Sequence, residues 1–323
     1  VLTGALSASL AMLGDTVDSA LLYINRTDGS WPAATGISEP LQIEPLAGGF
    51  VELGAEDVVV YSAYGAKILS LQPSYARPVL AVGGTHFAVY NRAGNELTIC
   101  SRTRTLYSQS FDAGILLCAM SNNNSLAVVT ESGRYAAQVQ VFDPSLHLLY
   151  SWEMTQSAGT PIALDFSPDS RRFAAGMLSA REGQLSCSVY FMSMDANAEG
   201  PVYTADQGSM LLRLDWQSER RVMAVFDTYL AVLDPTTGTE TARYDYGGAA
   251  LQSVAPGRRQ TALLLTVRGG NNLVTLSETL TPMAEIPARQ AFGVSATDTD
   301  IYLLCPDAVE CYGYDGVQNW VYS

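Results

Sequence analysis

Few side chains in this sequence are of the types that catalyse reactions or bind metals. The chain has two histidines, His86 and His147, which we expect at the start of a strand and in a turn of different repeats. A Ser–His–Asp triad or a histidine metal site needs a histidine beside its partners. The five cysteines lack the CxxC spacing of zinc and redox sites. We therefore expect no catalytic residue, no metal and no cofactor, and buried thiols rather than a Cys305–Cys311 bridge.

Two acidic residues, Asp165 and Asp215, occupy equivalent positions near the ends of predicted first strands. In one interpretation they belong to a ring of acids at a channel mouth that holds a cation or a sugar. Paired carboxylates there could also serve a glycan hydrolase or lyase. In the other, which we favour, each carboxylate accepts hydrogen bonds from turn N–H groups. Asp298-Thr-Asp300 likewise indicates a turn, because the oxygen spacing of a calcium loop is missing.

Three arginine pairs recur at one point of a repeat, just after its first turn. They are Arg171-Arg172, Arg220-Arg221 and Arg258-Arg259. If each sequence repeat forms one structural element, the three pairs lie on the same edge of the neighbouring repeats four, five and six. Such a patch could bind an anion or an acidic partner, or it could simply solvate that edge and offset nearby acids. We take these six arginines, with Asp165 and Asp215, as the candidate binding residues.

The repeat itself is a small polar turn followed by a strongly β-prone run. It occurs seven times, at 53–62, 81–90, 119–130, 164–176, 214–226, 254–266 and 294–305. Further strands follow each run, joined by turns such as Asp-Pro and Asp-Gly. Continuous apolar runs such as Ala262–Leu265 indicate strands buried on both faces. The pattern predicts an all-β, seven-bladed β-propeller of four-stranded antiparallel blades.

We place the blades at 48–77, 79–113, 115–157, 161–206, 210–247, 250–290 and 291–322. Leu41–Ile43 suggests an extra strand that closes against the last blade. The alternative is eight blades, with a partial blade from the N-terminal segment. Residues 1–30 are expected to be a separate segment, a short helix or the remnant after a membrane anchor or signal, and 31–323 the propeller. Val1–Leu13 is uncharged but shorter than the roughly 20 residues that span a bilayer.

Four stretches of the sequence also resemble a known family. They are Val60–Val79, Phe87–Asn95, Val128–Asp143 and Leu164–Met192, and they are similar to the bacterial domain-of-unknown-function family 5711. The resemblance extends over about residues 30–323. It implies a WD-like propeller on the outer side of a Gram-positive bacterial membrane, held by an N-terminal membrane helix that this chain lacks. The family carries no known activity.

The net charge of the chain disfavours two classes of partner. The net charge is −14, which disfavours contact with nucleic acid or anionic lipid. Together with the missing catalytic residues, this predicts a monomeric, non-enzymatic binding or scaffold module on the bacterial cell surface. One rim of the propeller would contact a protein, peptide or glycan. The alternative function remains the glycan hydrolase or lyase with acids at the channel mouth.

Overall fold

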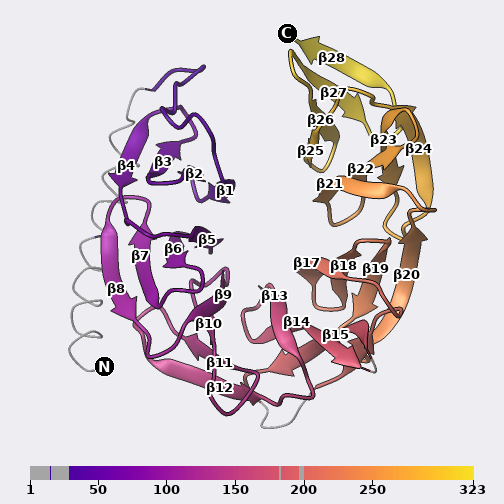
Figure 1. The fold of residues 1–323 in the computed structure, drawn as a ribbon. Coiled ribbons are helices and arrows are strands. Elements are labelled where there is room, and N and C mark those ends of the chain that lie inside the picture. The colour runs from indigo at the N-terminus through magenta and orange to yellow at the C-terminus, as the bar shows by residue number, and fades with distance from the viewer. Residues whose placement is uncertain (1–14, 16–28, 182, 196–199) are drawn as a thin grey trace. The chain divides into compact units, whose positions relative to one another are not determined.

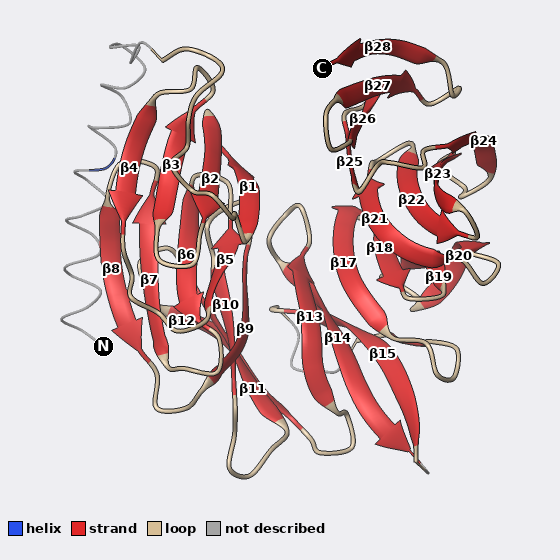
Figure 2. Ribbon diagram, turned by 45° about the horizontal axis from the view of Figure 1, so that its top comes forward, coloured by secondary structure: helices blue, strands red, loops and turns tan. Residues whose placement is uncertain are grey.

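The computed structural model describes Asp15 and residues 29–181, 183–195 and 200–323. Strands account for most of these residues, as Figure 2 shows. In this part of the chain 28 strands form seven four-stranded sheets, and each sheet is built from four strands that are consecutive in sequence. Figure 1 labels them in chain order. The fold is that of a seven-bladed β-propeller, as the repeats predicted.

The strand bounds, sheet by sheet, are as follows. The first three sheets contain β1 (Gln42–Leu46), β2 (Gly49–Leu53), β3 (Val58–Ser62) and β4 (Lys67–Leu71); β5 (Pro78–Val82), β6 (His86–Asn91), β7 (Glu96–Ser101) and β8 (Thr105–Ser110); and β9 (Ile115–Met120), β10 (Leu126–Thr130), β11 (Ala137–Phe142) and β12 (Leu148–Met154). The fourth sheet contains β13 (Thr160–Phe166), β14 (Arg172–Arg181), β15 (Gln184–Ser193) and β16 (Val202–Thr204). The last three sheets contain β17 (Leu211–Ser218), β18 (Arg221–Phe226), β19 (Tyr229–Asp234) and β20 (Thr239–Asp245); β21 (Ala250–Pro256), β22 (Thr261–Val267), β23 (Gly270–Leu276) and β24 (Pro282–Pro287); and β25 (Gly293–Ala296), β26 (Asp300–Leu304), β27 (Val309–Gly313) and β28 (Gln318–Tyr322).

The chain forms two compact units, residues 1–172 and 173–323. Within each unit, neighbouring sheets share hydrophobic layers. Strand β22 shows why its apolar run is continuous. Leu263 and Leu265 pack with the fifth sheet, whereas Ala262 and Leu264 pack with the seventh. Successive side chains of a strand point to opposite faces, so a strand buried on both faces needs apolar residues at every position. Each such leucine contributes roughly 1.5–3 kcal/mol to folding.

The recurrent polar turns have a common structural basis. In the third sheet Ser121 Oγ donates to Asn123 Oδ1 at 2.5 Å, and in the fourth Ser167 Oγ donates to Asp169 Oδ1 at the same distance. The next residue in each turn is left-handed, with φ of 66° at Asn124 and 58° at Ser170. A short polar side chain tolerates this conformation or stabilises the turn around it. In these two sheets, the polar turn of the repeat is therefore a hydrogen-bonded turn between the first and second strands.

The first sheet departs from the predicted first blade at 48–77. Its first strand, β1, spans Gln42–Leu46 and pairs antiparallel with β2. The segment predicted to be an extra closing strand is thus part of the first sheet, and that prediction is wrong. So is the eight-bladed alternative, because the described residues contain seven sheets. The polar turn at 53–62 connects the second and third strands of this sheet. The repeat had placed it between the first and second strands. Strand β1 gave no apolar run, because its residues alternate between exposed and half-buried until Leu46.

Three further sequence predictions can be placed on the structure. His86 begins β6 and His147 lies in the turn before β12, as predicted. All five cysteines are free, so Cys305 and Cys311 are not bridged. The predicted segment 1–30 falls almost entirely outside the described residues. Among the described residues, no helix has the length and apolar character needed to cross a membrane.

Candidate functional site

The three arginine pairs all lie in turns between the first and second strands of their sheets. Arg171 precedes β14 and Arg172 begins it, Arg220 precedes β18 and Arg221 begins it, and Arg258-Arg259 lie between β21 and β22. In an antiparallel sheet of consecutive strands, the first and third turns share one edge. In the second unit, we call this edge of the fifth, sixth and seventh sheets the turn edge. It carries four of the six arginines.

The first pair belongs to the serine turn described above. The backbone N–H of Arg171 donates to Asp169 Oδ1 at 3.2 Å, and Arg172 exchanges backbone hydrogen bonds with Ser167 Oγ, both at 2.9 Å. Burial tends to raise the pKa of Asp169. The Ser167 hydroxyl, the Arg171 N–H and the two guanidinium groups outweigh burial and lower that pKa. The pair thus helps to hold the Asp169 carboxylate ionised within its own turn.

Arg220 is engaged by an acid of its own sheet. Its Nη2 lies 3.0 Å from Asp234 Oδ2, and the arginine side chain is 77% exposed whereas the aspartate side chain is 10% exposed. The Thr236 backbone N–H, then the Thr236 hydroxyl and Arg220, lower the pKa of Asp234. Because the carboxylate also accepts from the Thr236 N–H at 2.8 Å, it caps the turn between β19 and β20. Arg220 is therefore bound to a turn-capping acid.

Arg221 lies between the fifth and sixth sheets. Its Nε donates to Gln217 Oε1 at 2.7 Å, and Gln217 Nε2 in turn donates to the Gly257 carbonyl and to Asp215 Oδ2, each at 3.0 Å. Burial lowers the pKa of Arg221, while the charges of Glu278 and Asp215 act in the opposite direction. This network joins the β17–β18 turn to the turn that carries Arg258 and Arg259.

The third pair, Arg258 and Arg259, lines a cavity between the sixth and seventh sheets. The cavity has a volume of about 320 Å³, at the lower end of the range for ligand pockets. Its walls are made by turns of both sheets and by one residue of β24. The lining residues are Gly257, Arg258, Arg259, Gln260, Ser277, Met283, Thr297, Asp298 and Tyr314.

Three charged side chains line this cavity. Both arginines and Asp298 are exposed, and within the described part of the chain none of the three side chains forms an ion pair or a hydrogen bond. The polar groups around them are largely occupied. Tyr314 donates its hydroxyl proton to the Thr297 carbonyl at 3.0 Å, and Ser277 Oγ accepts from the Thr281 N–H at 3.1 Å. The free charges are therefore the groups available to a ligand.

The two predicted acids take local partners. Asp165 lies on β13, where its Oδ1 accepts from the Phe166 N–H at 2.9 Å. Asp215 lies on β17 in the other unit and accepts from Gln217. Among the described residues, no group of three or more His, Cys, Asp or Glu side chains could hold a metal ion.

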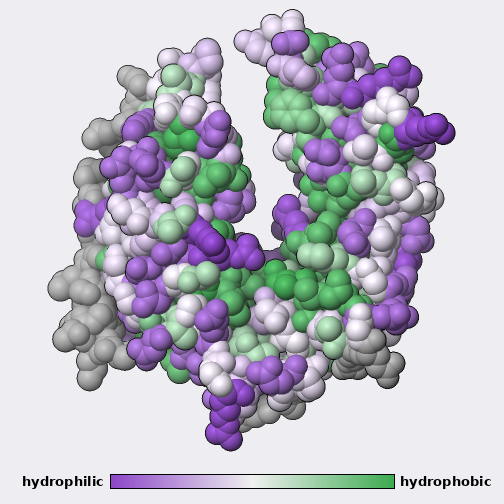
Figure 3. All heavy atoms as spheres, in the orientation of Figure 1, coloured by the Kyte–Doolittle hydropathy of each residue, from purple (hydrophilic) through white to green (hydrophobic). Residues whose placement is uncertain are grey.

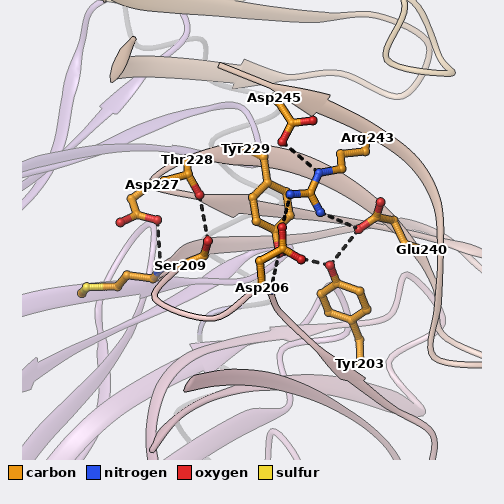
Figure 4. Close-up of polar contacts among 10 residues, drawn as sticks. Tyr203, Asp206, Ser209, Asp227, Thr228, Tyr229, Glu240, Arg243 and Asp245 are labelled. Carbon is orange, nitrogen blue, oxygen red and sulfur yellow. Dashed lines mark hydrogen bonds and ion pairs between the residues drawn. The ribbon is translucent and has the colours of Figure 1, made fainter. Parts of the chain in front are cut away.

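A second polar cluster of this unit was not marked by any sequence pattern. Figure 4 shows Arg243 of β20 surrounded by acids. Its guanidinium pairs with Asp206, lies 3.5 Å from Glu240 and 3.0 Å from Asp245, and stacks 3.6 Å above the Tyr229 ring. Glu240 and Asp245 lie on the same strand as Arg243, but Asp206 and Tyr229 come from separate segments, so spacing along the sequence does not reveal the whole cluster.

This cluster joins the fourth and fifth sheets. The Tyr203 hydroxyl donates to Glu240 at 2.7 Å and lies 3.1 Å from the Tyr229 hydroxyl. Beside it, Ser209 bonds Thr228 at 2.8 Å. Burial, followed by the hydrogen bonds to Tyr229 and Glu240, raises the pKa of Tyr203. Because every nitrogen of Arg243 has an acidic partner, the guanidinium is fully engaged, and the cluster acts as a clamp between sheets.

The surface of the second unit combines these polar groups with apolar ones. Met210, Leu212, Phe292 and Leu304 are exposed, and Figure 3 shows hydrophobic side chains along the region of β17, β21 and β25. Mixed surfaces of this kind are common in binding proteins, but scattered apolar residues alone define no site. The pocket with its free charges is the better-defined feature.

Comparison with solved structures places the fold among β-propellers. The chain aligns with BamB from Moraxella catarrhalis at 15% identity and a TM-score of 0.53, covering 87% of each chain. It aligns with the β-propeller domain of Cps50 (Swd1) from Myceliophteria thermophila at 9% identity and a TM-score of 0.60, covering 84% of this chain and 96% of that one. It also aligns with Hsv2p from Kluyveromyces lactis at 10% identity and a TM-score of 0.59, covering 88% and 97%. At these identities the likeness concerns the fold.

The sequence also matches a family as a whole. The profile of the family of unknown function DUF5711 matches residues 31–275, which is most of the chain. The protein is therefore a member of the DUF5711 family, as the resemblance indicated. No curated protein matches the chain significantly.

Proposed function

We propose that this protein is a non-catalytic binding or scaffold module that contacts its partner through the turn edge. The observation that carries the proposal is the pocket at Arg258 and Arg259. Two guanidinium groups without an acidic partner in the described chain stand out on a molecule with a net charge of −14. Such unpaired guanidinium groups attract an anionic group of a partner and orient it.

The six arginines of the three pairs do not contribute equally to this proposal. Arg220 is bound to Asp234, and Arg221 is bound to Gln217. We assign them to supporting the turn edge, and we assign partner contact to Arg258 and Arg259. Asp165 and Asp215 remain proposed supporting residues of their sheets. Asp165 and Asp215 each accept a local hydrogen bond, and we therefore do not propose the glycan hydrolase or lyase.

The cellular location of this module is also part of the proposal. We place the module on the outer face of a Gram-positive bacterial membrane, with residues 31–323 as the propeller and an anchor preceding it. Membership of the DUF5711 family supports this placement through the resemblance described above. The partner would then be a protein, peptide or glycan of the cell envelope.

The experiment is capture of partners by the tagged protein in the cells that encode it. We expect the double variant Arg258→Glu, Arg259→Glu to lose the partner. The matched control is Arg268→Glu, Arg289→Glu, which removes two exposed arginines from the opposite edge of the sixth sheet. Equal partner recovery by both double variants would contradict the proposal. Circular dichroism spectra should show that both variants retain the β-sheet signal.

A further inference from the structure

The pocket between the sixth and seventh sheets has two walls of opposite charge. The sixth sheet supplies Arg258, Arg259 and Gln260 from its β21–β22 turn, and the seventh supplies Asp298 from its β25–β26 turn. A ligand that satisfied both walls would carry an anionic group and a cationic group. A phosphate or a plain acid would satisfy only one wall and would leave Asp298 without a partner.

The contrast with the clamp in Figure 4 shows that these charges are not structural. Around Arg243 every guanidinium nitrogen has a carboxylate of this chain within reach. In the pocket, by contrast, the arginine and aspartate side chains form no ion pair within the described residues. Unpaired guanidinium and carboxylate groups that line a cavity are available to an external partner.

The remaining lining groups favour a peptide. Gln260 makes only a weak contact, with its Nε2 3.8 Å from Met283 Sδ, so its amide can still pair with a backbone amide. Tyr314 uses its proton on Thr297, which leaves its oxygen to accept from a ligand N–H. The Met283 side chain adds an apolar surface against which an alkyl chain can lie.

We propose that this pocket binds the carboxyl terminus of a peptide or protein whose last residue is lysine or arginine. This rests on the proposed function, because it names the partner chemistry of the same site. The terminal carboxylate would lie against Arg258 and Arg259, which present planar donors suited to it. The basic side chain would extend past Met283 to Asp298. A cavity of about 320 Å³ is large enough for one chain end.

The test is calorimetric titration of the purified chain with matched peptides. The reference is acetyl-Ala-Ala-Lys with a free carboxyl terminus. One comparison peptide replaces the carboxylate by a carboxamide, and another replaces lysine by norleucine, which removes the charge and keeps the alkyl chain. We expect each comparison peptide to bind at least about tenfold more weakly, since each loses a charge-assisted contact. Binding should also weaken with added salt.

Variants assign each loss to one wall of the pocket. In Arg258→Gln, Arg259→Gln, the preference for carboxylate over carboxamide should disappear. In Asp298→Asn, the preference for lysine over norleucine should disappear. The control Arg268→Gln, Arg289→Gln should keep both preferences. Equal binding of the carboxamide or norleucine peptide to the unmodified chain would overturn the inference, as would inorganic phosphate binding as tightly as the reference peptide.

The two proposals fail in different ways. If the pocket binds the reference peptide selectively but partner capture does not depend on Arg258 and Arg259, the proposed function is wrong and the pocket assignment stands. If capture depends on these arginines but persists when the partner's carboxyl-terminal basic residue is removed, the inference is wrong and the proposed function stands.

Discussion

At the scale of single residues, the fold contains charges and hydroxyls whose environment has measurable consequences. Glu52 lies on β2 and is 2% exposed, and its Oε2 has no hydrogen-bond partner among the described residues. A buried polar atom without a hydrogen-bond partner costs free energy, because it loses its hydration without compensation. We therefore expect the native side chain to lower stability at this position.

We expect Glu52→Gln to raise the free energy of unfolding at pH 7 by about 1 kcal/mol, because the neutral amide loses less hydration. Urea denaturation followed by circular dichroism measures the change. Glu39→Gln is the control, since Glu39 is exposed and its replacement should have no effect. A lower stability of the Glu52 variant would show that the carboxylate has a favourable role.

Tyr203 provides a test of pH dependence. Burial, followed by its hydrogen bonds to Tyr229 and Glu240, raises its pKa in the folded chain, whereas a tyrosine in an unfolded chain has a pKa of about 10. Above pH 10 the unfolded chain loses this proton first. The contribution of Tyr203 to stability is thus complete below pH 10 and is lost as the pH rises further.

We expect Tyr203→Phe to cost about 1 kcal/mol near neutral pH, and we expect its difference from the unmodified chain to shrink between pH 10 and 11. Urea denaturation at stepped pH values measures both. Tyr322→Phe serves as the control, because Tyr322 is 71% exposed. A difference that stayed constant or grew with pH would contradict the assigned hydrogen bonds.

At the scale of the elements, tight hairpins set the spacing of the strands. Gly49 begins β2, and a Cβ built there would lie 1.9 Å from the Tyr61 carbonyl oxygen of β3. We expect Gly49→Ala to lower the free energy of unfolding by about 2 kcal/mol, because the backbone of the first sheet must shift. At Gly133 nothing lies within 4 Å, so Gly133→Ala is the matched control. Thermal unfolding of both variants checks the prediction, and equal midpoints would contradict it.

The elements also show how far the sequence predicts this structure. Strands such as β22 were predictable because burial on both faces requires apolar residues throughout. Strand β1 was misassigned because its alternating exposure gives a weaker pattern. The arginine pairs could be placed in turns from their register, but Gln217 and Asp234, which engage one arginine each, could not. Gln217 lies across the same turn as Arg221 and Asp234 lies in another turn, and in both cases the contact depends on side-chain packing that the sequence pattern does not record.

At the scale of the whole molecule, charge and composition favour a chain that does not associate with itself. A net charge of −14 makes copies repel one another. We expect size-exclusion chromatography with light scattering to give a mass near the 34.6 kDa of one chain. The value should be unchanged between low and moderate salt. A mass of two chains at low salt would contradict the predicted monomer and would suggest that the turn edge contacts a second copy.

The pairing of each strand with its neighbours in sequence has a consequence for how the protein is made. Each of the seven sheets among the described residues consists of four consecutive strands. Almost no hydrogen bond within a sheet therefore requires a distant part of the chain. Local pairings of this kind carry a small loop-closure cost and form quickly. Each sheet can therefore assemble soon after its last strand leaves the ribosome, and its hydrophobic face is then covered when the next sheet is synthesised.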